Sequence, residues 1–410
     1  PKQGDISFSI APVSAESIKR KVIQLRKALD PKPRILGDIP EFNINLAHEL
    51  FASLFLPVKP GWKDAKDLLI VGYGPLGQIP FSILPTEPMH IDQETGILFS
   101  DYQNVPWLIK KASITRIPSA SSFVLLRKTP KGDEDRKAFI GFGDPIFNLE
   151  QLSRIEEQKN KDVTQLASRG LQIKVRGVRV TKKGALDNVK IVSSKIENLS
   201  RLPDTADEIK SIPQAIGADL KQDIFLGKQA SEKKVKTMDL SHRKIIAFAS
   251  HALVPGDLDG LDQPALAFSS PLITGDNDDG LLTMNEIMKL KLNADWVLLS
   301  ACNTGTSDGE GNESVSGLGK AFFYAGTRAI LASMWPVETT SAKKLTTRLF
   351  HIQKENPNFT RAEAFRQSML ELIKSPGMKD GKTGKMVASY AHPLFWAPFL
   401  IVGDSGIKEN

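Results

Sequence analysis

From about residue 138 onward, short apolar runs alternate with stretches whose apolar residues recur at helical spacing. The apolar runs have the length of β-strands, and most are followed by a helix signal such as a capping residue or a 3.6-residue period. Strand–helix alternation is typical of a parallel sheet with helices on both faces. We therefore expect an α/β fold built on a mostly parallel six-stranded sheet flanked by helices. Its strands are predicted at 138–142, within 218–226, and at 244–249, 296–300, 328–334 and 395–402.

The first 130 residues lack this alternation. Apolar runs at 68–71 and 79–84 flank a glycine-rich turn at 72–77, which predicts a β-hairpin. We therefore divide the chain into an N-terminal helix-and-hairpin subdomain, residues 1–130, and a main domain, residues 131–410. The other elements expected in the N-terminal part are helices at 14–30, 45–56 and 119–127 and a strand at 112–117.

The segment 150–200 interrupts the pattern of the main domain. Residues 151–200 hold 11 Lys and Arg against 5 Asp and Glu, a net charge of +6, and no aromatic residue. The overall charge of +7 and the pI of 9.2 would by themselves suggest nucleic-acid binding. Because the excess lies in one polar segment, we interpret 150–200 as a solvated insertion and expect no nucleic-acid partner. Binding of nucleic acid or of an acidic partner is the alternative.

The chain has a single cysteine, Cys302. A disulfide within the chain and a cysteine-built zinc site are therefore excluded. The acidic turn of Asp276, Asp278 and Asp279 does not fit a calcium loop, which needs a ligand where Gly280 stands. We expect no metal and no cofactor, with a metal ion at this turn as the alternative.

No apolar run approaches the ~18 residues of a membrane-spanning helix. We therefore expect no membrane span and a cytoplasmic protein. The chain begins Pro1-Lys2-Gln3, without an initiator methionine or a signal-type apolar core. We interpret it as a processed form or a piece of a longer protein, which leaves the compartment open.

Two chemically active side chains come directly after predicted strands. His251 follows the run at 244–249, and Cys302 follows the run at 296–300. If these strands are neighbours, ~4.8 Å apart, both side chains leave the same edge of the sheet, where parallel sheets bind ligands. An imidazole beside a thiol can take its proton and later give it to a leaving amine. A buried core cysteine and an unrelated surface histidine are the alternative that spacing leaves open.

A series of short motifs along the chain resembles one family. The motifs lie at 69–81, 117–120, 141–145, 202–206, 248–252, 261–266, 280–286, 293–305 and 317–326. They are similar to those of CHAT domains, which are caspase-like and share a clan with caspases, metacaspases, gingipains and separase. The match spans roughly 45–403, and the segment 150–200 matches nothing in it. The resemblance implies the caspase–hemoglobinase fold and a cysteine endopeptidase with a catalytic dyad of His251 and Cys302.

The resemblance also implies how the reacting carbonyl is held. The backbone N–H groups of Cys302 and Ala252 would bind the oxyanion. Ala252 stands where related enzymes often have glycine, and its Cβ narrows the approach to its N–H group. No third catalytic side chain is evident in the sequence.

A specificity pocket is expected in the segment 335–339, which resembles the pocket-forming segment of separase and other CHAT domains. Trp335 would form its wall, and Glu338 could supply a negative charge for a basic residue of the substrate. The alternative is that Glu338 only begins the following helix, where a carboxylate suits the helix dipole. Ser300 stands where arginine-preferring metacaspases have an aspartate, so this position supplies no carboxylate for a basic residue of the substrate.

The resemblance points to a protein substrate and to regulation by a preceding part of the protein. Members often carry helical repeats before this domain, so an N-terminal sensor or repeat domain of a bacterial TPR-CHAT type of protein is expected. The favoured function is a cysteine endopeptidase that cleaves a specific protein partner. A catalytically silent, caspase-like interaction module is the main alternative, and a nucleic-acid-responsive regulator using the segment 150–200 is the third.

Overall fold

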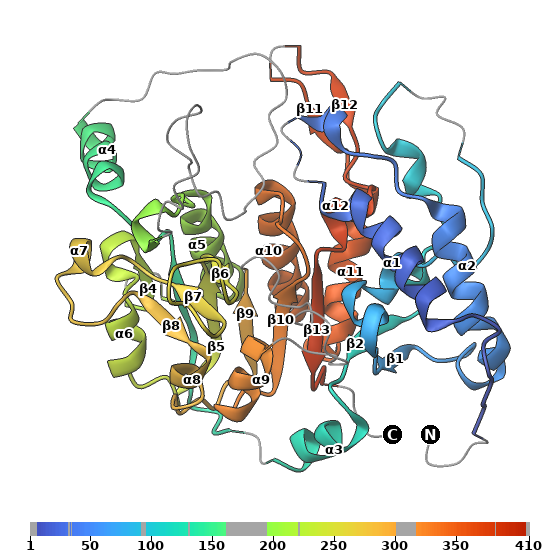
Figure 1. Ribbon diagram of the computed structural model, residues 1–410, viewed down its shortest axis with the longest axis horizontal. Coiled ribbons are helices and arrows are strands. Elements are labelled where there is room, and N and C mark those ends of the chain that lie inside the picture. The colour runs from blue at the N-terminus through green and yellow to red at the C-terminus, as the bar shows by residue number, and fades with distance from the viewer. Residues whose placement is uncertain are drawn as a thin grey trace.

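The computed structural model describes residues 6–31, 33, 35–91, 96–129, 132–160, 195–219, 222–300, 317–381 and 383–406. These residues form a central sheet of eight strands in the order β1-β2-β13-β10-β9-β5-β3-β4, with helices on either side (Figure 1). The strands are β1 (Asp67–Ile70), β2 (Ser113–Arg116), β3 (Lys137–Gly143), β4 (Ile224–Leu226), β5 (Arg243–Ala249), β9 (Trp296–Leu299), β10 (Ala329–Ser333) and β13 (Phe399–Gly403).

The sheet is mostly parallel, as predicted. Within the described part of the chain, β10 and β13 are the one antiparallel pair of neighbours in it. The strands β4, β3, β5, β9 and β10 therefore run in one direction, and β13, β2 and β1 run in the other. The carboxyl ends of the first group meet at one edge of the sheet, which is where ligands bind in folds of this kind.

Helices cover both faces, because side chains along each strand alternate between two cores. On β5, Ala247 and Ala249 belong to the core under α5, α10 and α11, whereas Ile246 and Phe248 belong to the core under α6, α8 and α9. The α-helices are α1 (Ala15–Leu29), α2 (Ile44–Leu54), α3 (Ala120–Lys128), α4 (Leu149–Asn160), α5 (Asp204–Ile216), α6 (Glu232–Thr237), α7 (Pro271–Thr274), α8 (Met284–Ile287), α9 (Gly317–Tyr324), α10 (Thr339–Glu355), α11 (Arg361–Lys374) and α12 (Pro393–Trp396).

Two smaller sheets lie beside the central one. In the described residues, β6 (Ala252–Leu253), β7 (Ala265–Ala267) and β8 (Leu281–Thr283) form an antiparallel sheet that begins just beyond the end of β5. The strands β11 (Met378–Lys379) and β12 (Met386–Ala388) pair as a short hairpin. No helix in the described ranges is both long enough and apolar enough to cross a membrane.

The predicted hairpin at 68–84 is wrong. The strand β1 is present, but the chain after it forms two short 3₁₀ helices, at Gly74–Gln78 and Phe81–Ile83. The buried Arg116 guanidinium explains why, since it donates hydrogen bonds to the carbonyls of Gly77 (2.7 Å) and Ile79 (2.8 Å) that a strand would use for its ladder. Instead β1 pairs with β2 in parallel.

The number of strands also differs from the expectation in a specific way. Six of the described strands of the central sheet lie after residue 131, as predicted for the main domain. The strands β1 and β2 extend that same sheet beyond β13, so it has eight strands in the described chain and not six. The division of the chain at residue 130 stays a prediction.

The segment 150–200 is not solvated along its whole length. Its described N-terminal end lies in α4, which ends at Asn160. At its C-terminal end Ile196 and Leu199 are buried in a small core with Phe147 and Leu253. The end of the predicted insertion is therefore part of the folded domain, next to the segment that follows β5.

A close backbone approach after α9 requires glycine. Gly326 has φ of +110°, and a Cβ there would lie 2.2 Å from the carbonyl oxygen of Leu292. We expect Gly326→Ala to lower the free energy of unfolding by about 3 kcal/mol or more. The matched control is Gly256→Ala, which has a positive φ of +90° but nothing within 4 Å of its Cβ and should cost about 1–2 kcal/mol. Urea unfolding followed by circular dichroism measures both, and equal losses would contradict the steric argument.

Candidate active site

The strands that precede His251 and Cys302 are neighbours. The strand β5 pairs with β9 in parallel, with Phe248 opposite Leu299. His251 comes three residues after Phe248, and Cys302 comes three residues after Leu299. The adjacency on which the predicted site depends is therefore present, and both residues follow the same edge of the sheet at the same offset. Cys302 itself lies outside the described residues.

The imidazole of His251 is buried and held by a backbone carbonyl. His251 is fully buried, and its ring packs against that of Phe147 with centroids 5.6 Å apart. Its Nε2 atom lies 2.7 Å from the carbonyl oxygen of Ser200. Its Nδ1 atom is buried and makes no hydrogen bond to any described residue. The ring is therefore fixed at one nitrogen and open at the other.

This contact determines which nitrogen carries the proton. A carbonyl oxygen can only accept, so Nε2 must donate, and in the neutral ring Nδ1 then holds the lone pair. Burial lowers the pKa of His251 below its usual 6.5, and the hydrogen bond to Ser200 opposes that shift without reversing it. A neutral imidazole with a free Nδ1 is the form that can accept a proton from a nearby thiol.

The loop that carries Ser200 is tied to the end of β3. The Arg201 guanidinium donates from Nε and Nη2 to the two oxygens of the Asp144 carboxylate, at 2.8 and 2.6 Å. The N–H of Asp144 donates to the hydroxyl of Thr205 at 2.7 Å. Burial raises the pKa of Asp144 despite the opposing effect of Arg201, so the ion pair mainly offsets the cost of burying the carboxylate. These contacts hold the carbonyl that orients His251.

The N–H group of Ala252 is directed away from β7. Ala252 pairs with Leu266, and the N–H of Ala267 donates to the carbonyl of His251 at 2.9 Å. In antiparallel pairing, this pattern makes Ala252 and Leu266 a non-hydrogen-bonded pair, whose N–H groups point outward from the two strands. The hydroxyl of Ser250 donates to the carbonyl of Ala267 and so attaches the chain between β5 and β6 to β7. A backbone donor is thus available next to the imidazole.

A family model of the CHAT domain matches residues 45–404. The match covers most of the chain, including His251 and Cys302. The chain belongs to the CHAT domain family. The resemblance read from the motifs is thereby confirmed.

One relative of this CHAT domain is a much longer protein. Human tetratricopeptide repeat protein 28 is 29% identical over 133 residues, which are 32% of this chain and 5% of that protein. The chain therefore spans a small part of the length of this relative.

Solved structures that are similar to this chain at low sequence identity include the following three. The separase–securin complex of Saccharomyces cerevisiae aligns with 74% of this chain and 15% of the matched chain, at a TM-score of 0.37 and 15% identity. The Arg-specific cysteine proteinase gingipain R (RgpB) aligns with 95% of this chain and 74% of the matched chain, at a TM-score of 0.43 and 11% identity. The complex of Porphyromonas gingivalis RgpB pro- and mature domains aligns with 95% of this chain and 76% of the matched chain, at a TM-score of 0.39 and 10% identity.

Trp335 and Glu338 of the CHAT domain lie in the segment after β10. Trp335 is fully buried, and its indole N–H donates to the carbonyl of Leu394 at 3.2 Å. The Glu338 carboxylate accepts hydrogen bonds from the N–H groups of Thr340 (2.9 Å) and Ser341 (2.7 Å) at the start of α10. This is the capping role that we gave as the alternative for Glu338. Substrate contacts of either residue stay predictions.

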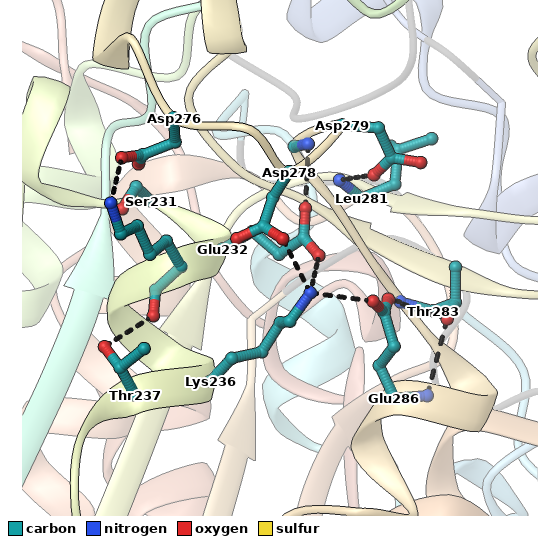
Figure 2. A network of polar contacts seen from close by, with 12 residues as sticks. Ser231, Glu232, Lys236, Thr237, Asp276, Asp278, Asp279, Leu281, Thr283 and Glu286 are labelled. Atoms are coloured by element: carbon teal, nitrogen blue, oxygen red, sulfur yellow. Dashed lines mark hydrogen bonds and ion pairs between the residues drawn. The ribbon is translucent and has the colours of Figure 1, made fainter.

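One residue of the acidic turn, Asp278, belongs to a cluster of carboxylates around Lys236 (Figure 2). The Lys236 ammonium lies 2.9 Å from Glu232, 2.8 Å from Asp278 and 3.0 Å from Glu286. The other Glu232 oxygen accepts the N–H of Gly280 at 2.8 Å. Burial raises the pKa of Glu232 to about 7. Within the described residues, no group of three or more His, Cys, Asp or Glu side chains is placed to hold a metal ion.

Sequence reasoning missed the residues that support His251. Ser200 acts through its backbone carbonyl, which no side-chain motif can reveal. Arg201 and Asp144 carried a weak signal, because Asp144 follows the end of β3 just as His251 follows the end of β5. Glu208, whose carboxylate contacts Ser300, carried none, because an acidic residue within a helix is ordinarily exposed.

The tautomer and the pKa of His251 can be measured. We expect ¹⁵N NMR to show a neutral ring protonated at Nε2 at pH 7, with a pKa below the value that the same residue has in urea. Since the folded-state pKa is lowered, the unfolded chain takes up the proton first, so the free energy of unfolding begins to fall as the pH drops below about 6.5 and stops falling once the pH is below the folded-state pKa. A ring protonated at Nδ1, or a pKa above 6.5, would contradict the assignment.

Proposed function

We propose that this CHAT domain is a cysteine endopeptidase that cleaves a protein partner. The observation that carries the proposal is the imidazole of His251, which is fixed through Nε2 and open at Nδ1 at the edge of β5. Cys302 follows the adjacent strand β9 at the same offset. Family membership supports the same pairing of histidine and cysteine.

In the proposed reaction, Nδ1 of His251 takes the proton from the Cys302 thiol. The thiolate attacks the carbonyl carbon of the scissile peptide bond, and the proton passes from His251 to the nitrogen of the leaving amine. The acyl-enzyme is then hydrolysed by a water molecule that His251 deprotonates, which releases the new carboxyl end and restores the thiol. Burial assists the first step, because a neutral imidazole is needed to accept the proton.

The negative charge that develops on the substrate's carbonyl oxygen must be stabilised by hydrogen-bond donors close to His251 and Cys302. The N–H of Ala252 faces away from β7 beside the imidazole, and the N–H of Cys302 is the proposed second donor. Backbone donors fixed by a sheet are effective because they need no reorganisation during the reaction. The Cβ of Ala252 leaves less space for the substrate carbonyl to reach this N–H group than a glycine would.

The proposed substrate is a protein brought to the site by a recruiting part. A helical repeat region is our candidate for that part. It is supported by the human relative, which is named for tetratricopeptide repeats and of which this chain covers 5%. A silent interaction module remains the competing function, and the catalytic test below separates the two.

Removing either proposed catalytic side chain should abolish cleavage. We expect Cys302→Ala and His251→Ala to lower kcat/KM for a cleaved peptide by about three decades or more. The readouts are peptide hydrolysis and covalent labelling by a peptidyl electrophile, which Cys302→Ala should lose. Circular dichroism of each variant controls for folding. Retained cleavage by Cys302→Ala would sink the protease assignment, and a wild-type chain that neither cleaves nor labels would favour the interaction module.

The role of Glu338 in specificity can be separated from its role as a helix cap. Its carboxylate is already bonded to the first turn of α10, so we expect Glu338→Gln to cost about 0.5–2 kcal/mol of stability. We expect the preference for the residue before the scissile bond, read from a peptide library, to stay unchanged. A preference for basic residues that disappears in Glu338→Gln would instead assign the carboxylate to the pocket beside Trp335.

A further inference from the structure

A buried carboxylate lies beneath the end of β9. Glu208, on α5, is 1% exposed, and its Oε2 accepts a hydrogen bond from the Ser300 hydroxyl at 3.0 Å. Ser300 is itself buried, and its N–H continues the ladder to β5 by donating to the carbonyl of Phe248 at 3.0 Å. Ser300 stands two residues before Cys302 in the chain. The carboxylate thus contacts the last described residue before the proposed nucleophile.

Burying the Glu208 carboxylate costs free energy, and the groups that contact it indicate its structural role. Removing an ionised carboxyl from water is strongly unfavourable unless donors replace the lost hydration. A carboxylate can only accept, so the Ser300 hydroxyl proton must point toward Glu208. On its other side, Oε1 lies 3.4 Å from the hydroxyl of Thr346 on α10. The end of β9 is therefore attached through Glu208 to two helices.

The same stretch of chain contacts the histidine side of the site. Ser200 accepts the hydrogen bond from His251, and Thr205, in the first turn of α5, accepts the N–H of Asp144. Residues 200–208 therefore reach the ends of β3, β5 and β9 from one segment. Of these contacts, those to the ends of β3 and β9 come from the helix α5 itself, and a rigid helix holds such groups more tightly than a loop would.

We infer that Glu208 is a positioning residue for the Cys–His site. Through the Ser300 hydroxyl it fixes the end of β9, and so the start of the segment that leads to Cys302, relative to the imidazole that Ser200 orients. This inference rests on the proposed function. Reaction rates fall steeply when a nucleophile is misplaced by about an ångström, so losing this anchor should reduce turnover more than substrate binding.

The variants follow from the two partners. Ser300→Ala removes the donor, Glu208→Leu removes the acceptor, and Glu208→Gln keeps an acceptor oxygen in the same shape. The matched control is Thr347→Val, which removes the 2.7 Å hydrogen bond from Thr347 to Ser211 and so weakens the same two helices without touching β9. The double variant Ser300→Ala/Glu208→Leu tests whether the two side chains act through one contact.

Two readouts distinguish positioning from simple destabilisation. We expect Ser300→Ala and Glu208→Leu to lower kcat for peptide cleavage by about tenfold to a hundredfold with KM little changed, and Glu208→Gln to stay within about threefold of wild type. The double variant should be no slower than the slower single one. The rate at which iodoacetamide alkylates Cys302, measured against pH, should fall in Ser300→Ala and Glu208→Leu and stay near the wild-type rate in Glu208→Gln. The control Thr347→Val should change only the melting temperature.

The outcomes separate this inference from the proposed function. Wild-type kcat and alkylation rates in Ser300→Ala and Glu208→Leu, or losses equal to those of Thr347→Val, would overturn the positioning role and leave the protease assignment intact. Alkylation does not require peptide hydrolysis. A wild-type chain that cleaves no peptide, but whose Cys302 alkylation slows in Ser300→Ala, would therefore support the positioning role and contradict the protease.

Discussion

The parallel pairing of β5 with β9 is the constraint on which the candidate site depends. Phe248 and Leu299 are opposite each other, and both side chains enter the core under α6, α8 and α9. A slip of one residue would turn the apolar side chains of either strand to the wrong face. Cores on both faces of the sheet therefore determine the register, and the register sets the equal offsets of His251 and Cys302.

Around this pairing, the protein orients an imidazole with backbone groups. Ser200 supplies a carbonyl to Nε2, and the pairing of Ala252 with Leu266 directs an N–H outward beside it. Backbone groups suit this role because packed elements hold them in place and they do not change charge with pH. The Arg201–Asp144 ion pair then ties the carbonyl's loop to the end of β3. Much of what prepares His251 is therefore invisible in a list of side chains.

Several features of the fold could be predicted because local chemistry and tertiary structure agree. The Thr283 hydroxyl and the Glu286 carboxylate form a capping box at the start of α8, and Gly326 follows the end of α9 with a positive φ, both features that neighbouring residues in the chain favour. The hairpin at 68–84 was wrong for the opposite reason. Its apolar residues and glycines allow a hairpin, but Arg116, about 40 residues away in the chain, uses the carbonyls that the second strand would need.

The sequence by itself determined the alternation of strands and helices, the two-faced core, and the placement of His251 and Cys302 after apolar strands. It could do so because each depends on the period of apolar residues or on a motif within a few positions. Only the tertiary structure decided that β1 and β2 extend the sheet, that Ser200 fixes the tautomer of His251, that Glu338 caps α10 and that Glu208 lies beneath β9. These depend on hydrogen bonds between groups far apart in the chain, and such partners are set by how the elements pack and not by local sequence.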